Sequence, residues 1–558
     1  MKRRFLAALI IVAGVALTTV ESYAQSYGGA VLDHDIMMPA DFASLSQTQV
    51  FGSSRSMAMG GAFTSLGADI SSVGINPAGL GMYSHDLISF TPMVSVANSE
   101  TTGTPSWVGN SKTMFSFANM GAVCNILESS SGSLISLNVA FTYNRLADYN
   151  TKMSFSSQSE YNSTTNDLIP TIVDVFGMQL GGAGIYPTST GSMEYENDPY
   201  FWPAQSAYKT YLLDPTSGNS SWTTNTIGHN ASVISSYSVE QSGRTDEYSF
   251  AFGGNIANVI YFGATIGLQE INQTTQYVYQ EEYRYYTDEG YAFGSSEDIY
   301  PLDYQADYSN LWQETKLSGT GVNLKLGLTA RPTRALRIGV AYHSPTYYSV
   351  ARTYQTSTET LILGNYSDLV ASERFTATSP LFIDNYEYCW RFRTPSKLLA
   401  GASLQVGSFG LLAVDYERQW YNWTRVTNSP GGLSTYDYKL SFENSYKPTN
   451  TLRVGLEVKP IPTVALRVGG GASSSMIKDE SQFYSSPVAT DSHYITCGVG
   501  LFLTPTTTLD IAYQYNHQNY TPYRLFYAED SEGFIVSSNL FESSLNRSFI
   551  SATLTFRI

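Results

Sequence analysis

Few residues in this 558-residue chain could carry out catalysis, and their spacing does not bring them together. A hydrolase needs a serine, a histidine and a carboxylate placed as a set, and the chain has no G-x-S-x-G elbow. The three cysteines, Cys124, Cys389 and Cys497, are an odd number without metal-ligand spacing. The six histidines are His34, His85, His229, His343, His493 and His517. We predict no catalytic residue, no enzyme activity, no metal and no cofactor.

Arginine could instead bind an anion. Arg337, Arg453 and Arg467 each lie in a segment with an apolar residue at every second position. They could hold a substrate carboxylate, or they could pair with Glu457, Asp415 and Asp510 along a polar interior wall, which we favour. His343 lies in the same kind of segment and is the best single candidate for a haem ligand or a base, although a lone interior histidine is more often a hydrogen-bonded wall residue. The predicted polar ladder consists of Arg337, His343, Arg453, Glu457 and Arg467.

The segments that would position these side chains have the two-residue period of β-strands. Val322, Leu324, Leu326 and Leu328, for example, alternate with small or polar residues. Short turns join many of these segments at one end, and long polar connections join them at the other, including 157–243 and 356–380. The predicted strands are fourteen, at about 86–97, 112–125, 133–155, 245–257, 259–284, 308–330, 335–355, 381–406, 409–423, 438–459, 463–474, 487–503, 507–517 and 545–558.

An even number of antiparallel strands, apolar on one face and charged on the other, predicts an all-β fold: a transmembrane β-barrel with lipid outside and a polar or plugged interior. A soluble β-sandwich is the alternative, but its core would not bury so many charges. The final strand alternates up to Ile558 with Phe556 two residues earlier, which resembles the C-terminal signal read by the barrel assembly machinery. The machinery and outer-membrane lipid are therefore predicted partners.

Composition excludes other classes. Only 14% of the residues are charged, and 31 Lys plus Arg against 47 Asp plus Glu give a net charge of −16, which disfavours binding of nucleic acid. After the N-terminus, no apolar run is long enough for a membrane helix. Residues 1–24 read as a secretory signal peptide, with Lys2, Arg3 and Arg4 before an apolar stretch and Ser22-Tyr23-Ala24 at the cleavage site. A retained anchor helix is the alternative.

Residues 25–85 do not alternate, and we predict that they form a plug inside the barrel of residues 86–558. The small residues between Ser56 and Ala62 favour a short helix ended by glycine. The segment SMAMGGAFTSLGADISSVGINPAGLGMY, residues 56–83, resembles the N-terminal signature of the FadL family of outer-membrane transporters for long-chain fatty acids and other hydrophobic compounds. The strand count and the long 157–243 connection extend the resemblance over most of the chain.

The resemblance implies passive transport in the outer membrane of a Gram-negative bacterium. A hydrophobic ligand would be captured by the extracellular loops, pass through the plugged lumen and leave sideways through a distorted strand. The plug motif would be Asn76, Pro77 and Ala78. Met57, Met59, Phe63 and Leu66 are candidates for ligand contact, although ordinary packing of the plug is the interpretation we favour for them. The alternatives are a non-transporting surface scaffold, with 157–243 binding another protein, and a haem receptor.

Overall fold

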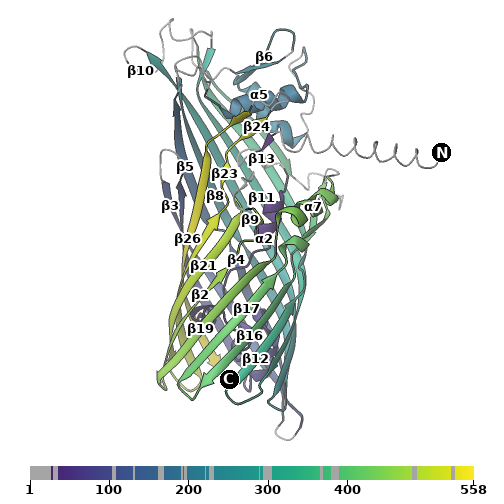
Figure 1. Ribbon diagram of the computed structural model, residues 1–558, viewed down its shortest axis with the longest axis vertical. Helices are drawn as coiled ribbons and strands as arrows, with labels where there is room; N and C mark the ends of the chain where they lie inside the picture. The colour runs from purple at the N-terminus through teal and green to yellow at the C-terminus, as the bar shows by residue number, and fades with distance from the viewer. Residues whose placement is uncertain are drawn as a thin grey trace, which may run out of the picture.

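The computed structural model describes residues 27–28, 36–102, 108–129, 132–160, 169–189, 193, 198–219, 221–224, 231–287, 290–292, 304–364, 369–378, 389–430, 433–479, 487–529 and 535–558. The predicted signal peptide lies outside these residues. A closed antiparallel sheet forms a tall barrel of tilted strands, with helices at one end and short turns at the other (Figure 1). The wall has fourteen strands, as the sequence predicts, and β26 closes it by pairing with β2.

The closed sheet contains twenty-one segments, because several of the fourteen wall strands consist of more than one. The divided strands are β4 with β5, β10 (Gly290–Ala292) with β11, β12 with β13, β14 (Leu369–Thr378) with β15 and β16, β17 with β18, and β22 with β23 (Tyr523–Arg524). The other eighteen segments are β2 (Leu87–Thr102), β3 (Val108–Glu128), β4 (Leu134–Asp148), β5 (Thr151–Glu160), β8 (Ala231–Ile256), β9 (Ile260–Thr287), β11 (Tyr304–Ala330), β12 (Leu336–His343), β13 (Tyr347–Gly364), β15 (Trp390–Arg393), β16 (Lys397–Val406), β17 (Gly410–Gln419), β18 (Arg425–Asn428), β19 (Thr449–Ile461), β20 (Val464–Ser473), β21 (Ala489–Phe502), β22 (Thr507–Tyr520) and β26 (Leu540–Arg557).

The outer face of the lower wall is apolar. In β9 the side chains of Ile260, Ile266 and Leu268 are exposed, Phe262 and Ala264 at the outward positions between them are half-buried, and the alternate residues are buried. Exposed apolar side chains at alternate positions continue around the wall, and a lipid-facing surface requires this arrangement. On β9 the outward positions become polar from Glu270 onward, so the upper part of this strand projects beyond the lipid. Among the described helices, none has the length and hydrophobicity needed to cross a membrane.

Several predicted elements differ from the structure. β8 begins at Ala231, within the predicted connection 157–243, and β13 and β14 (Leu369–Thr378) extend into the predicted connection 356–380. Two predicted strands are replaced or interrupted. The predicted strand 438–459 begins as helix α7 (Thr435–Ser445), whose Ser434 side chain caps its first turn by accepting from the Asp437 N–H, and β19 starts only at Thr449. Tyr438 and Phe442, four residues apart, are buried on the same face of α7. This spacing fits one face of a helix as well as one face of a strand, so the apolar alternation does not distinguish the two. The predicted strand 381–406 is interrupted at Pro395, between β15 and β16, and its residues 381–388 lie outside the described part of the chain.

The N-terminal segment lies inside the barrel and contacts inward-facing wall residues. It contains α2 (Pro39–Leu45), α3 (Ser54–Ala58), α4 (Ser72–Ile75) and the 3-10 helix η1 (Pro77–Met82). The predicted short helix is α3; Ser53 caps its start, and Gly60 and Gly61 follow it with φ of +63° and +70°. The segment is fastened at many points, including hydrogen bonds from the Ser54 N–H to Thr553 Oγ1 (2.6 Å) and from Asn138 Nδ2 to the Leu80 carbonyl (2.7 Å).

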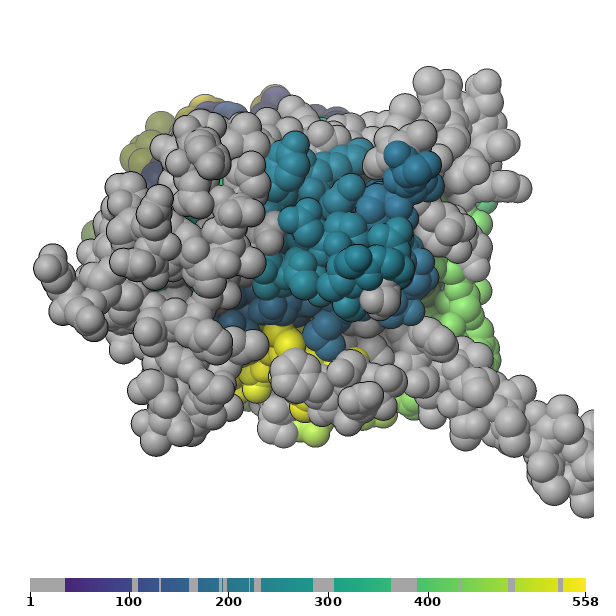
Figure 2. All heavy atoms as spheres, turned by 90° about the horizontal axis from the view of Figure 1, so that it is seen from above, coloured from purple at the N-terminus to yellow at the C-terminus, as the bar shows by residue number. Residues whose placement is uncertain are grey.

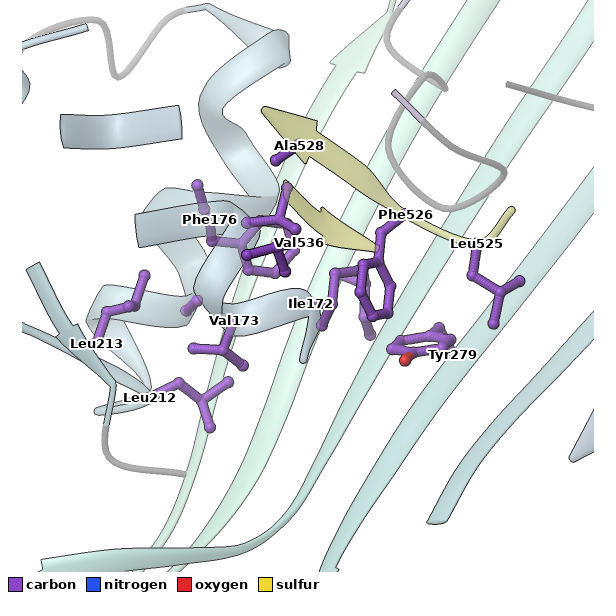
Figure 3. Close-up of a cluster of buried hydrophobic side chains, with 14 of the residues drawn as sticks. Ile172, Val173, Phe176, Leu212, Leu213, Tyr279, Leu525, Phe526, Ala528 and Val536 are labelled. Carbon is purple, nitrogen blue, oxygen red and sulfur yellow. The ribbon is translucent and has the colours of Figure 1, made fainter. Parts of the chain in front are cut away.

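A cap of helices and short strands covers the opposite end from the short turns. It contains α5 (Ile172–Gly182), α6 (Trp202–Lys209), the hairpin β6 (Leu213–Pro215) and β7 (Trp222–Thr224), and β24 (Tyr527–Glu529) with β25 (Ile535–Ser537). Viewed from above, blue and teal side chains of the chain region that carries α5 and α6 occupy the middle of this end (Figure 2). Ile172, Phe176 and Phe526 converge with Tyr279 of β9 in one buried apolar cluster (Figure 3).

A buried carboxylate lies at the base of this cap. Glu281 of β9, well above the lipid-facing residues, is fully buried and accepts hydrogen bonds from the Ile172 N–H (3.0 Å) and from the hydroxyls of Tyr279 (2.7 Å) and Tyr283 (2.8 Å). Burial raises the pKa of Glu281 to about 7, although these three hydrogen bonds favour the charged form and oppose the shift. The Glu281 carboxylate therefore binds its proton more tightly in the folded cap than in the unfolded chain.

This linkage predicts a cap that loosens as pH rises. Because the folded pKa is raised, the contribution of Glu281 to stability is complete below about pH 4.5 and is lost as pH rises through about 7. In hydrogen exchange corrected for intrinsic rates, α5 amides should exchange more slowly at pH 5 than at pH 8, and Glu281→Gln should remove that difference. The neighbouring Glu282→Gln, at a side chain that is 43% exposed, is the control. Equal pH dependence in both variants would contradict the prediction.

Candidate functional site

The plug rests on glycines of the wall. A side chain at Gly253 would place its Cβ 2.6 Å from the Leu80 Cβ, and one at Gly498 would place its Cβ 2.6 Å from the Ala58 Cβ. The strand register sets several of these glycines opposite one another, as in Gly253 and Gly263. The wall glycines that approach the plug are Gly253, Gly263, Gly327, Gly339, Gly401, Gly455, Gly469 and Gly498. They form a belt that lets the plug backbone approach the sheet closely.

The predicted plug motif is the point where this belt meets η1. Asn76 is the N-cap residue of η1: its Oδ1 accepts from the Ala78 N–H (3.1 Å), and its Nδ2 donates to the Thr64 carbonyl (2.6 Å) and to Thr329 Oγ1 of β11 (3.2 Å). Pro77 occupies the first position of η1, where a missing N–H costs no hydrogen bond. Asn76 thus joins two parts of the plug to each other and to the wall.

The four candidate ligand-contact residues are all buried. Met57 packs against Met93 and Phe549 of the wall, whereas Met59, Phe63 and Leu66 pack with Ala413 of β17. The two cavities described below are lined by other residues. The role of these four side chains in ligand contact therefore stays a prediction that depends on movement of the plug.

The structure brings most of the predicted polar ladder into ion pairs. Arg467 Nε lies 2.7 Å from Glu457 Oε2, which also pairs with Arg55 of α3 at 3.2 Å, and Arg467 Nη1 lies 2.6 Å from Asp510. Arg453 pairs with Glu417 at 2.8 Å instead of Asp415, whose carboxylate accepts from the Thr64 N–H of the plug (2.7 Å).

The two remaining ladder residues have different surroundings. His343 Nε2 is 2.9 Å from the Ile75 carbonyl, so it contacts the plug backbone. Arg337 has no ion pair within the described part of the chain and is partly buried near the short-turn end of β12. A role for any of these five side chains in holding a ligand stays a prediction.

A small cavity of about 140 Å³ lies between the plug and the wall. Its lining mixes apolar side chains, such as Phe51 and Leu399, with the charged or titratable side chains of Glu247, Lys325, His343, Glu417 and Arg453. Lys325 Nζ is 2.5 Å from Glu247 Oε1, and both side chains are almost completely buried. Buried charges of this kind suit a hydrated space better than an alkyl chain.

A larger cavity of about 840 Å³ opens on the lipid-facing side of the wall, at β2, β3, β4 and β8. Its lining is mainly apolar and includes Phe90, Phe115, Phe117 and Phe141, whose side chains are between 38% and 63% exposed. Arg145 lines both this wall cavity and the smaller cavity of the lumen. Arg145 thus lies between the two spaces.

The wall cavity exists because two neighbouring strands part. β3 pairs with β4 only from Asn119 to Glu128, and above Asn119 its described residues pair with β2 alone. Side-chain bridges mark the two ends of the gap: Asn119 Nδ2 to Asn144 Oδ1 (2.5 Å) below, and Lys112 Nζ to Glu240 Oε1 (2.8 Å) above.

Local backbone irregularities lie beside this parting. The β2–β3 register shifts between Thr91 and Pro92, and Pro92 cannot donate to the ladder. Between β4 and β5 the strand breaks at Tyr149 and Asn150, opposite Gly243, whose φ is +123°. That φ lies in a region that glycine adopts far more readily than other residues.

Charged groups border the apolar cavity. Arg145 Nε is 3.1 Å from Asp246 Oδ1, Arg244 Nε is 2.6 Å from Asp246 Oδ2, and the Tyr143 hydroxyl donates to Asp246 Oδ1 (2.8 Å). The contacts of Tyr143 and Arg145 with Asp246 cross from β4 to β8, whereas Arg244 and Asp246 both belong to β8. None of them joins β3 to β4. Glu270 of β9 lies opposite Asp246 in the register.

Sequence reasoning did not locate this site. Pro92 lies within a predicted strand, and Gly243 lies just before another, and either residue could have indicated an irregular wall. The sequence does not show that both irregularities lie on the same side of the barrel, because their relative position depends on which strands pair.

No protein-family model and no curated protein matches the chain. Solved structures do resemble it. The Pseudomonas putida toluene transporter TodX is 11% identical with a TM-score of 0.47, covering 90% of this chain and 97% of TodX. A Pseudomonas aeruginosa FadL homologue is 10% identical with a TM-score of 0.48, covering 91% and 99%.

The Ralstonia pickettii toluene transporter TbuX is 13% identical with a TM-score of 0.44, covering 91% of this chain and 98% of TbuX. One of these three proteins is thus a homologue of FadL, whose family signature residues 56–83 resemble.

The glycine belt predicts that plug seating depends on the absence of a side chain at Gly253. Gly253→Val should displace η1 and raise ion conductance in planar bilayers, because Cβ would lie 2.6 Å from Leu80 Cβ and 2.9 Å from the Pro77 carbonyl oxygen. Gly410→Val is the control, since its nearest neighbour would be 3.5 Å away. Heat-modified gel mobility verifies folding of both variants. Wild-type conductance in folded Gly253→Val would show that the belt is not needed.

Proposed function

We propose that the protein carries a hydrophobic small molecule, such as a long-chain fatty acid or a similar lipid, passively across the outer membrane of a Gram-negative bacterium. The molecule is captured at the extracellular loops, passes alongside the plug and leaves sideways through the wall cavity. The observation that carries this proposal is the apolar cavity of about 840 Å³ at the gap between β3 and β4. Closed pairing would leave no such path.

The energetics favour a lateral exit. Each methylene that moves from water into an apolar environment contributes about 0.8 kcal/mol, so an alkyl chain leaving through the wall stays out of water and needs no energy source. The exposed Phe115 and Phe141 make the cavity continuous with the lipid-facing surface.

Entry into the lumen requires the plug to move. The lumen cavity is small and contains buried charges, and Arg55–Glu457 and Thr64–Asp415 fasten the plug to the wall. Movement at Asn76, Pro77 and Ala78 would release η1 from β11 and expose the apolar plug side chains, including Met59 and Phe63.

A non-transporting scaffold is the second candidate, and the same fastening favours it. The cap covers the extracellular end with a packed cluster, and the predicted capture loops 157–243 and 356–380 fall partly outside the described residues. A haem receptor has less support, because His343 contacts the plug backbone within the wall.

A disulfide between plug and wall separates transporter from scaffold. Ser54 Oγ and Ser551 Oγ are 2.9 Å apart, close to the geometry that a disulfide needs. In a background with Cys124, Cys389 and Cys497 replaced by serine, the double variant Ser54→Cys, Ser551→Cys should assemble, lose uptake of radiolabelled fatty acid when oxidised, and regain it with reductant. The Ser54→Cys single variant is the control. Full uptake by the oxidised double variant would argue against plug movement.

Filling the wall cavity tests the exit separately. Ala122 of β3 lines the cavity, and Ala122→Trp should lower uptake several-fold without changing the amount of folded protein. Leu412→Trp, at an exposed apolar side chain of β17, is the matched control because it adds the same ring on another side of the barrel. If both variants take up ligand at the wild-type rate, the exit lies elsewhere.

A further inference from the structure

A cationic and aromatic patch lies on the outer surface just above the apolar band, near α7. We define this rim patch as Arg393, Arg418, Trp420, Trp423, Arg425 and Lys439. With Asp437 and Glu443 of α7 included, four positive and two negative side chains give +2. This local sign is opposite to the net charge of −16 for the chain.

Strand alternation places the arginines on the outside of the wall. Phe392 of β15 and Val426 of β18 are buried in an interior cluster, so their neighbours Arg393 and Arg425 point away from the lumen. On β17 the outward side chains run from the exposed Val414 and Tyr416 to Arg418. The patch therefore begins where the apolar outer face ends, at the level expected for lipid headgroups.

The strand register sets two cations directly opposite each other. Arg393 of β15 pairs with Arg425 of β18, and like charges at opposed positions are destabilising. Arg425 is neutralised by Glu443, at 2.6 Å, and also donates to the carbonyls of Asn422 and Thr424. Arg393 forms no ion pair with any residue that the structure describes. An anion from outside the chain would relieve this repulsion.

The neighbouring aromatic side chains suit a sugar. Trp420 and Trp423 stack with ring centroids 5.2 Å apart and planes 10° apart, and Trp423 is half exposed. The Arg418 guanidinium lies over Trp420 at 6.0 Å and is held by Asn450 Oδ1 (3.2 Å). An arginine braced on a tryptophan presents its remaining N–H groups in the fork geometry that matches phosphate.

We propose that the rim patch binds the phosphorylated sugar headgroup of an outer-leaflet glycolipid, with phosphate at Arg393 and Arg418 and a sugar ring on Trp423. The acyl chains would lie along the apolar outer face below. This inference rests on the proposed outer-membrane location, but it does not require that the protein transport anything.

The test uses the full-length protein in phosphatidylcholine nanodiscs with purified lipid A, an acylated disaccharide that carries phosphates. Native mass spectrometry should find lipid A on the wild type, and Arg393→Gln with Arg418→Gln should lower its retention at least about tenfold. Lys316→Gln, at an exposed cation of β11, is the matched control and should keep wild-type retention. Enzymatically dephosphorylated lipid A should be retained far less than lipid A by the wild type.

Equal retention by the double variant and the wild type, equal retention of dephosphorylated lipid A, or no retention by the wild type would overturn the proposal. Uptake of fatty acid is measured on the same variants and should not change. Loss of lipid A retention by the double variant, together with normal fatty acid uptake, supports lipid binding at the rim patch independently of transport. Retention of lipid A by the wild type, with no fatty acid uptake by any of the proteins, supports the rim patch and counts against the transport function.

Discussion

Hydrogen bonding of the backbone in lipid constrains the whole molecule. A sheet that faces hydrocarbon must pair every strand edge, because lipid offers no partner to an exposed N–H or carbonyl. The closure of β26 on β2 meets this requirement for the barrel as a whole. The gap between β3 and β4 is a local departure, and side-chain bridges at Asn119 and Lys112 mark its limits.

The interior follows a different rule, since the plug must approach the wall closely enough to fill the barrel. Glycines on many strands allow this close approach. Asn76 then fixes the plug in place by donating hydrogen bonds to the Thr64 carbonyl and to Thr329 Oγ1. Ion pairs such as Arg55–Glu457 add further polar contacts between plug and wall. The plug is therefore held both by directed polar contacts and by apolar packing, as where Met57 packs against Phe549.

The sequence predicts the barrel well because its main signal is local. Period-two alternation gives the strand count and the inside–outside assignment without knowledge of any partner strand. The same approach failed at 438–459, where Tyr438 and Phe442 are spaced to fit a helical face as well as a strand. The wall cavity and the rim patch depend on which strands are neighbours. Arg393 and Arg425 are 32 positions apart, and only the register shows that they face each other.

The most direct test of the central claim follows a hydrophobic molecule through the wall. A fatty acid bearing a terminal diazirine can be photoactivated during uptake in reconstituted membranes, and the labelled peptides can be identified by mass spectrometry. The account predicts ligand-dependent labelling concentrated at residues 114–122 and 141–150 beside the gap, suppressed by excess unlabelled fatty acid. Labelling spread evenly over the lipid-facing strands, without competition, would contradict a lateral path at this site.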